Sequence, residues 1–341
     1  MYKIKAEDSI GKILTHDVTK IVAEGGVLEK YPVFKKNHII REEDVAVLLS
    51  IGKEYIYAGD IEAGMVHEND AAIAMGKMCE NEYLKHTDVS EGRVDIIAQK
   101  AGVLKINIDK LYEINTVENF IISTIHKNSA VKEGQKVAGM KIIPLMIEEE
   151  KMEYVKNIQK EVPLLSLKPY VKSKVGLVIT GSEIYHGRRK DAFTPIIKDK
   201  LKAYEAELIG TRIAYDDENL IAEYIEKFLE EGAEIILCTG GMSVDPDDKT
   251  PIAIRKAATE VISHGAPVVP GAMWMLAYKG EVPIMGVPGG ALFNKCTPVD
   301  IFLPRLLADD KVNRREIVEM SHGGYCLKCK VCHFPQCSFG K

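Results

Sequence analysis

The chain has 341 residues, of which 46% are hydrophobic and 28% are charged, and its formal net charge is −5. This balance is typical of a folded globular protein and excludes a general electrostatic affinity for nucleic acid or for anionic membranes. Single cores usually stop growing near ~250 residues, so we expect two or three domains. No basic and then apolar leader opens the sequence, and no apolar run approaches the ~18 residues that cross a bilayer, so we expect a cytoplasmic protein that partners neither nucleic acid nor membrane.

The first 150 residues predict two small modules. In residues 1–60, short alternating segments precede a helical pattern at 42–51, which indicates a mixed α/β module. Residues 61–150 begin with an alanine- and methionine-rich helical stretch over 61–90 and continue with short β-branched runs between turns from 92 to 147. This pattern favours a helix followed by a β-rich subdomain.

The clearest pattern lies in residues 174–308, behind a charged and proline-containing stretch at 151–173 that we expect to be a linker. Residues 175–179 are an unbroken apolar run, as a parallel strand covered on both faces requires. Strands alternating with amphipathic helices predict an α/β domain with a doubly wound, mostly parallel sheet. The expected strands are 175–179, 208–214, 234–238, 268–269 and 282–287, and the expected helices are 195–207, 220–228, 251–259 and 299–308.

Glycines and carboxylates fill the loops that follow these strands. The loops are Thr180-Gly181-Ser182-Glu183, then Asp216-Asp217, then Thr239-Gly240-Gly241-Met242-Ser243 with Asp245, Asp247 and Asp248, and finally Pro288-Gly289-Gly290. Because such loops emerge at one edge of a parallel sheet, we expect them to meet there. Glycine turns beside Arg188, Arg189 and Lys190 suit a phosphate, whereas carboxylates suit a divalent metal or the polar edge of a heterocycle. Taken alone, Asp216 and Asp217 are most simply the cap and first-turn acid of the next helix.

In this order and at this spacing, the loop residues resemble the molybdopterin-binding domain of molybdenum-cofactor biosynthesis proteins. The likeness is greatest to the molybdopterin molybdenumtransferase branch, since Ser243-Val244 follows the paired glycines and Asp248 comes a few residues later. Pro270-Gly271 and Gly286-Val287-Pro288-Gly289 extend the likeness. The resemblance covers residues 174–308 closely, and the preceding modules only in architecture.

The resemblance implies that the glycine turns bind the phosphate of molybdopterin and that molybdate binds near the dithiolene. Its expected catalytic acids are Glu183, Asp248 and Asp217, with Mg²⁺ screening their charge. Carboxyl groups that deliver protons would assist the loss of oxygen from the oxyanion as two sulfurs displace it. The residues carried over as cofactor-binding are Thr180, Gly181, Ser182, Asp216, Thr239, Gly240, Gly241, Met242, Ser243, Pro288, Gly289 and Gly290.

The sequence also departs from the family pattern. Asp245 stands where glycine is usual, residues 269–273 lack two expected lysines, and Gly290-Ala291 replaces an Asn-Pro pair. Only 33 residues follow Ala308, so we expect the family's carboxy-terminal β-barrel to be lacking. The retained Glu183 and Asp248 favour the first hypothesis, an enzyme that inserts molybdenum into molybdopterin, free or adenylylated. The missing lysines and barrel favour a second, a non-catalytic molybdopterin carrier or sensor. A nucleotide hydrolase, with the aspartates holding magnesium over a pyrophosphate, is a third.

Residues 309–341 carry four of the seven cysteines, at Cys326, Cys329, Cys332 and Cys337. Four thiols at these gaps can converge on one metal centre, so we expect an iron–sulfur cluster or Zn²⁺, with His322 and His333 keeping zinc open. The alternative is a flexible reduced tail. A metal-bearing tail could also dock on a molybdoenzyme client, and analogy with the family makes a homodimer the expected assembly.

Overall fold

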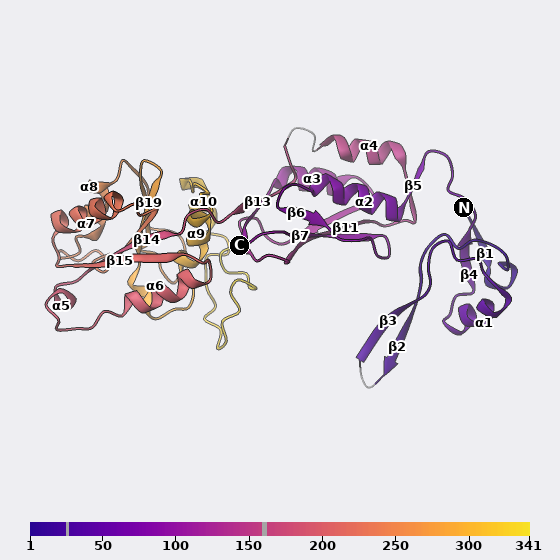
Figure 1. Cartoon of the computed structure of the whole chain (residues 1–341), viewed down its shortest axis with the longest axis horizontal. Helices are drawn as coiled ribbons and strands as arrows, with labels where there is room; N and C mark the ends of the chain where they lie inside the picture. The colour runs from indigo at the N-terminus through magenta and orange to yellow at the C-terminus, as the bar shows by residue number, and fades with distance from the viewer. Residues whose placement is uncertain (25–26, 159–161) are drawn as a thin grey trace. The chain divides into compact units, whose positions relative to one another are not determined.

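The computed structural model describes residues 1–24, 27–158 and 162–341, which form two compact units (Figure 1). The first unit comprises Met1–Ile97, Asn107–Thr124 and Lys136–Leu165, and the second comprises Ala98–Ile106, Ile125–Gln135 and Ser166–Lys341. In the described part of the chain, no helix is both long enough and apolar enough to cross a membrane.

The beginning of the first unit is a mixed α/β module, as its sequence pattern predicts. Its elements are β1 (Tyr2–Lys5), η1 (Ala6–Asp8), β2 (Val18–Glu24), β3 (Val27–Phe34), α1 (Glu42–Ser50) and β4 (Tyr55–Ala58). Strands β1 and β4 pair antiparallel, and β2 and β3 form a separate hairpin. Buried Leu14, Ile40, Leu48 and Ile56 contribute to one small core.

The rest of the first unit combines helices with two antiparallel sheets, ordered β6-β7-β11-β9 and β12-β5. Its strands are β5 (Met65–His67), β6 (Leu84–His86), β7 (Arg93–Ala98), β9 (Phe120–Thr124), β11 (Lys136–Ile142) and β12 (Met146–Glu148), and its helices are α2 (Glu68–Cys79), α3 (Ile108–Thr116) and α4 (Glu149–Ile158). The helix expected over 61–90 is therefore shorter, because Glu80 leaves the helical conformation. Helix α3 was not expected; the Asn107 side chain caps it, and it buries Leu111 and Ile114.

The stretch 151–173, expected to be a linker, instead contains regular structure. Helix α4 extends into it and buries Met152 and Val155, which lie three residues apart on one helix face. Strand β13 (Leu165–Pro169) buries Leu165 and Leu167 at the two-residue spacing of a strand. Residues 159–161 of the expected linker lie outside the described residues.

The second unit is built on a six-stranded sheet with the order β15-β14-β16-β19-β18-β17. Strands β15, β14, β16 and β19 are parallel, and β18 and β17 complete the sheet antiparallel, so the mostly parallel doubly wound domain is confirmed. The strands are β14 (Lys174–Thr180), β15 (Glu207–Ala214), β16 (Ile235–Thr239), β17 (Glu260–His264), β18 (Met275–Lys279) and β19 (Val282–Val287), and the helical elements are α5 (Ser182–Tyr185), α6 (Phe193–Lys202), α7 (Glu218–Glu230), α8 (Thr250–Ala257), η2 (Gly289–Leu292), α9 (Pro298–Leu307) and α10 (Arg314–Glu319). A small sheet, ordered β10-β8-β13, adds β8 (Gly102–Ile106) and β10 (Ala130–Val131) to this unit.

Both faces of the six-stranded sheet are covered, which explains the unbroken apolar run of β14. Val175, Leu177 and Ile179 pack with α6 and α9 on one face, whereas Val178 packs with α7 and α8 on the other. Trp274 stacks on Phe302 of α9, with 4.6 Å between the ring centroids. The sheet therefore supplies a fixed edge from which its loops project.

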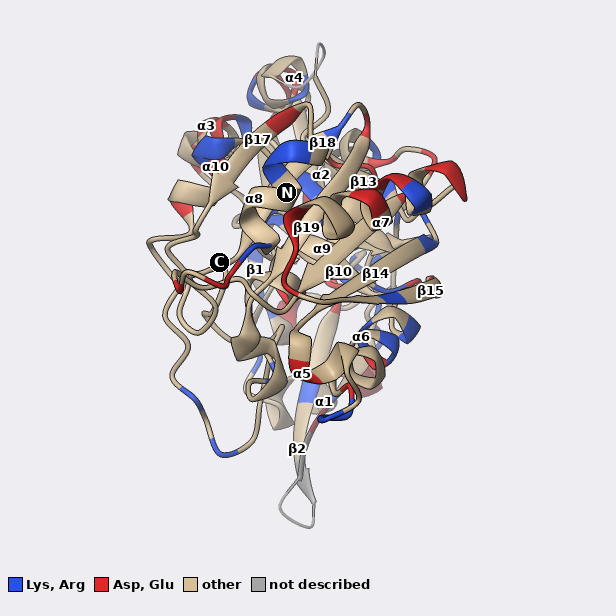
Figure 2. Ribbon diagram, turned by 90° about the vertical axis from the view of Figure 1, so that its left-hand side faces the viewer, with Lys and Arg blue, Asp and Glu red and all other residues tan. Residues whose placement is uncertain are grey.

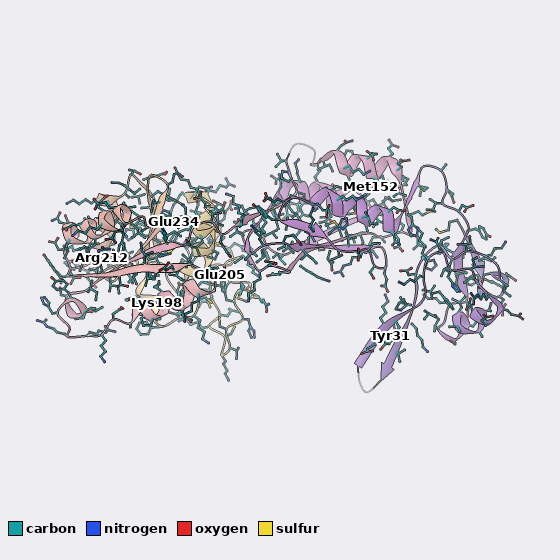
Figure 3. All side chains as sticks on the ribbon, in the orientation of Figure 1. Tyr31, Met152, Lys198, Glu205, Arg212 and Glu234 are labelled. Carbon is teal, nitrogen blue, oxygen red and sulfur yellow. The ribbon has the colours of Figure 1, made fainter. Side chains whose placement is uncertain are left out.

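Helix α7 shows why glycines interrupt the two strands beneath it. A Cβ atom at Gly176 would lie 2.6 Å from the Phe228 ring, so the bare backbone of β14 makes room for that ring. Arg212 of β15 covers Phe228, with its guanidinium carbon 4.1 Å from the ring centroid; the residue is labelled in Figure 3.

The short strand expected at 268–269 is not formed. The structure places β17 and β18 on either side of it, and Val269 makes only an isolated parallel bridge to Tyr325. The expected strand has only two residues, Val268 and Val269, and it cannot continue because Pro270 follows directly. The proline nitrogen has no hydrogen to donate to a ladder of strand hydrogen bonds.

Candidate functional site

A cavity of about 540 Å³ lies at the carboxyl ends of β14, β15 and β16. It is lined by the glycine turns that follow β14 and β16, by acidic residues of three loops, and by Arg189 and Lys190. Leu292 of η2 closes another side of it. Three of the four loops that the sequence predicts at one edge of the sheet therefore share one cavity, whereas Pro288-Gly289-Gly290 does not line it.

Gly240 allows two of these loops to touch. Its φ angle is +85°, and a Cβ atom there would lie 1.9 Å from the carbonyl oxygen of Thr180. No other residue fits, because the obstructing atom belongs to the backbone of the neighbouring strand. The following Gly241 also has a positive φ, of +52°.

Thr250, the first residue of α8, is hydrogen-bonded to the same turn. Its buried hydroxyl donates a hydrogen bond to the carbonyl oxygen of Gly240 at 2.7 Å and lies 3.0 Å from the hydroxyl of Thr180. One hydroxyl thus links the loop after β14 to the loop after β16. Nothing in the sequence singles out Thr250, since a threonine at the start of a helix is common.

Asp216 and Ser182 hold the first turn in place. The Asp216 carboxylate accepts hydrogen bonds from the Ser182 amide at 3.0 Å and from the Ser182 hydroxyl at 2.7 Å. Both bonds use the same oxygen, Oδ2, so Oδ1 makes neither of these two contacts. Asp216 thus serves both to position the turn and to border the cavity.

The neighbouring Asp217 has a different place. Its Oδ1 accepts hydrogen bonds from the amides of Asn219 and Leu220, at 2.9 and 2.8 Å, and so caps the amino terminus of α7. It does not line the cavity. The structure therefore separates the acid pair into one cavity residue and one helix cap.

Acidic side chains outnumber basic ones around the cavity, five to two. Glu183 is the acidic residue of the short helix α5, which is otherwise tan in Figure 2, and Asp216 follows β15. Asp245, Asp247 and Asp248 come from the loop after β16, where the Asp248 carboxylate accepts a hydrogen bond from the Asp245 amide at 3.2 Å. A ligand that carries negative charge would need a cation to enter such a cavity.

Several residues carried over from the family lie outside the cavity lining. Thr239 is buried and its hydroxyl donates to the Val287 carbonyl oxygen at 3.3 Å. Met242 packs into the core, where a Cβ atom at Gly286 would lie 2.5 Å from its Cε. Ser243, Pro288, Gly289 and Gly290 are likewise absent from the lining residues, although η2 begins at Gly289 and contributes Leu292.

The oxygen donors of the cavity suit Mg²⁺, which prefers carboxylates and water to nitrogen or sulfur. Across residues 1–24, 27–158 and 162–341, the structure gathers no group of three or more histidine, cysteine or acidic side chains that could hold a metal ion.

The cysteine-rich tail is docked on the second unit. The Val269 amide donates to the Gly324 carbonyl oxygen, and the Cys326 amide donates to the Val269 carbonyl oxygen, both at 2.8 Å. At the far end, Phe339 is buried in the core and the Gly340 amide donates to Gly323 at 3.0 Å. The tail is thus an ordered lobe that contacts the segment where the two family lysines are missing.

Comparisons with known proteins agree with these features. A family model described as a probable molybdopterin binding domain matches residues 176–306, and a model described as a domain of unknown function matches residues 3–60. Molybdopterin molybdenumtransferase of Synechococcus elongatus is 23% identical over 147 residues, which are 40% of this chain and 36% of that protein. A CinA-like protein of Mycobacterium avium is 32% identical over 80 residues, which are 24% of this chain and 18% of that protein.

Two solved structures are also similar. The molybdopterin biosynthesis enzyme MoaB from Thermus thermophilus is 21% identical, with 41% of this chain and 98% of that chain covered and a TM-score of 0.36. A molybdenum cofactor biosynthesis protein from Pyrococcus furiosus is 15% identical, with 90% of this chain and 63% of that chain covered and a TM-score of 0.27. The resemblance read from the glycine turns is thus confirmed for residues 176–306 by the family model.

Proposed function

We propose, from the match of residues 176–306 to a probable molybdopterin binding domain, that the chain inserts molybdenum into molybdopterin, free or adenylylated. The observation that supports this proposal most is the cavity in which glycine turns meet five carboxylates. Turns of this kind suit the pterin phosphate, and acids suit the chemistry of the metal.

The acids have a chemical task in this proposal. Molybdate loses oxygen as water when the two dithiolene sulfurs replace it, so each departing oxygen must gain protons. Glu183 and Asp248 line the cavity and are the proposed proton donors. Mg²⁺ held by other carboxylates of the cavity, such as Asp216, would offset the negative charge of the phosphate and of molybdate, while Glu183 and Asp248 keep their protons for transfer.

Asp217 has a weaker claim to catalysis than the other two acids. Its carboxylate already accepts two amide hydrogen bonds of α7, which a substitution would remove together with any chemical role. We therefore retain Glu183 and Asp248 as the proposed catalytic pair and treat Asp217 as a residue that shapes the loop.

A non-catalytic carrier or sensor is the second candidate. The docked tail favours it, because the lobe lies on Val269, in the segment where the family has lysines. In this alternative the domain binds the pterin, the cysteines Cys326, Cys329, Cys332 and Cys337 hold an iron–sulfur cluster or Zn²⁺, and the lobe docks on a molybdoenzyme client. Both candidates carry the expectation of a cytoplasmic homodimer.

One reconstitution separates the two candidates. Purified full-length protein is incubated with molybdopterin, molybdate and Mg²⁺, and the active cofactor formed is measured by its ability to activate a cofactor-free molybdoenzyme. Insertion predicts that Glu183→Ala and Asp248→Ala each lower the rate by about 100-fold or more, the range of a lost general acid. Glu230→Ala, at an exposed acid of α7 outside the cavity lining, is the matched control and should leave the rate unchanged.

The contrary result is equally clear. Tight pterin binding without cofactor formation, unaltered by either substitution, would exclude the enzyme and leave the carrier. Omitting Mg²⁺ in parallel tests whether the acids act with a divalent ion, since its removal should then reduce both binding and insertion.

A further inference from the structure

Five cysteines border one cavity of about 310 Å³ in the second unit. Four of them, Cys326, Cys329, Cys332 and Cys337, belong to the tail, and the fifth is Cys296, between η2 and α9. All five are free thiols. The sequence gives no reason to associate Cys296 with the tail, because 30 residues separate it from Cys326.

Contact between two of the thiols joins the domain to the lobe. The Sγ atoms of Cys296 and Cys332 lie 3.3 Å apart, although the residues are 36 positions apart in the chain. Two thiolates on one tetrahedral ion with bonds of ~2.3 Å lie about 3.8 Å from each other. The two sulfurs would therefore need to separate by only about half an ångström to share an ion of this size.

The lobe is held where such sharing is possible. Hydrogen bonds with Val269 hold the tail just before Cys326 and at Cys326. Burial of Phe339 holds it just after Cys337. Cys326 and Cys337 also pack, half-buried, against the core of the domain. The tail cysteines are therefore presented to Cys296 by the fold.

The charge of the surroundings suits a thiolate centre. Lys295, Lys328 and Lys330 border the same cavity, and no acidic residue is among those that line it. Four thiolates on a dication carry a net charge of about −2, which nearby ammonium groups would stabilise. Sulfur donors also select thiophilic metals over Mg²⁺.

We propose that Cys296 and Cys332 are ligands of one tetrahedral, thiophilic ion of the Zn²⁺ type, which joins the tail lobe to the pterin-binding domain. The remaining ligands come from the other tail cysteines that border the cavity, after their side chains turn toward the ion. This inference rests on the proposal that the tail holds a metal and is independent of the pterin chemistry. It adds a ligand from the domain itself and favours a single ion over an iron–sulfur cluster.

The test is metal binding by the full chain, purified without oxygen. Zinc content is measured by mass spectrometry, affinity by competition with a chelator, and thiolate ligation by the sulfur-to-metal absorption of the Co²⁺-loaded protein. We expect one ion per chain. Cys296→Ala and Cys332→Ala should each weaken binding by more than the ~10–100-fold that follows loss of an outer partner, and should weaken the Co²⁺ absorption.

Cys79→Ala is the matched control, since Cys79 is a buried thiol of α2 in the other unit and should leave both readouts unchanged. Circular dichroism of each variant verifies that it folds. Full zinc content and an unaltered Co²⁺ spectrum in Cys296→Ala, with losses in the tail variants, would overturn the role of Cys296 alone. A wild-type chain that takes up no Zn²⁺ would overturn the metal proposal as well, and pterin binding would still be measurable in either case.

Two further results would also count against a shared ion. Iron and sulfide in the purified protein, with visible absorption, would identify a cluster instead. A Cys296–Cys332 disulfide found by mass spectrometry in protein alkylated directly at lysis would show that the two thiols pair with each other.

Discussion

Asp310 and Arg305 form a buried ion pair, in which the arginine Nε donates to Asp310 Oδ2 at 2.7 Å. The same guanidinium donates to Glu316 of α10 at 2.7 Å. Lys105 of β8 and Lys168 of β13 approach the Asp310 carboxylate at 2.7 and 3.1 Å. The Asp310 carboxylate thus links Arg305 of α9 to the small sheet of the second unit, and Arg305 also links α9 to α10.

Removal of the Asp310 charge should destabilise the second unit. Asp310→Asn leaves the buried Arg305 without one of its two counter-charges, which both lie at 2.7 Å, and loss of one partner of a buried pair typically costs about 3–5 kcal/mol. Trp274, the only tryptophan, is buried in this unit, so its fluorescence during urea unfolding reports the change. Asp309→Asn is the control, because Asp309 is mostly exposed and its pair with Lys172 should contribute about 0–1 kcal/mol. Equal small losses in the two variants would show that the buried pair is not stabilising.

The same network predicts how stability depends on acid. Burial alone would raise the pKa of Asp310, but the positive charges of Arg305 and Lys105 outweigh it and lower the pKa to about 2. Since an unfolded aspartate titrates near ~3.9, the contribution is complete above that pH and is lost as the pH falls toward 2. Its size is about 2–3 kcal/mol.

The measurement is the free energy of unfolding from Trp274 fluorescence at pH 5.5 and at pH 3. Other carboxylates also titrate in this window, so the comparison is between the wild type and Asp310→Asn. The wild type should lose more stability than the variant over this interval. Parallel losses would mean that the pKa of Asp310 is not lowered in the folded protein.

The sheet of the second unit is predictable from sequence because its local pattern and its burial agree. The residues of β14 point alternately to the two covered faces of the sheet, so all of them are apolar. An unbroken apolar run of this length therefore indicates a strand that is buried on both faces. Helices α3 and α4 are hard to recognise from sequence, because α3 has only nine residues and follows closely on strand β8, whereas α4 lies in a strongly charged stretch. There, packing against the rest of the first unit decides the conformation.

The candidate site divides in the same way. The glycine turns are visible in sequence because φ angles such as that of Gly240 require glycine. The different roles of Asp216 and Asp217 cannot be predicted from sequence, since either of two adjacent acids can cap the next helix. The path of the backbone in the loop decides that Asp217 caps α7 and that Asp216 contacts Ser182. The approach of Cys296 to Cys332 is a tertiary contact without any local signal.

Gly240→Ala should disrupt the turn that we assign to the pterin phosphate. The added Cβ would lie 1.9 Å from the carbonyl oxygen of Thr180, so the two loops must separate. We expect pterin binding to weaken about tenfold or more and the second unit to lose about 1–3 kcal/mol, typical of a strained backbone position. Gly232→Ala is the control, because its φ is also positive, at +81°, but nothing lies within 4 Å of a Cβ atom there and the residue is outside the cavity lining. Fluorescence titration with the pterin and urea unfolding measure the two effects, and equal behaviour of the variants would contradict the assignment.

Thr250 offers a milder test of the same turn. Thr250→Val keeps the shape but removes the hydroxyl that donates to Gly240 at 2.7 Å, which leaves a carbonyl oxygen without that donor. Such a loss typically costs about 1–3 kcal/mol when the group is buried. Thr250→Ser retains the hydroxyl and should recover most of the stability and of the pterin affinity, as measured by unfolding and titration. If Thr250→Val keeps wild-type stability and pterin affinity while Thr250→Ser loses them, the methyl group matters and the hydrogen bond between α8 and the glycine turn does not.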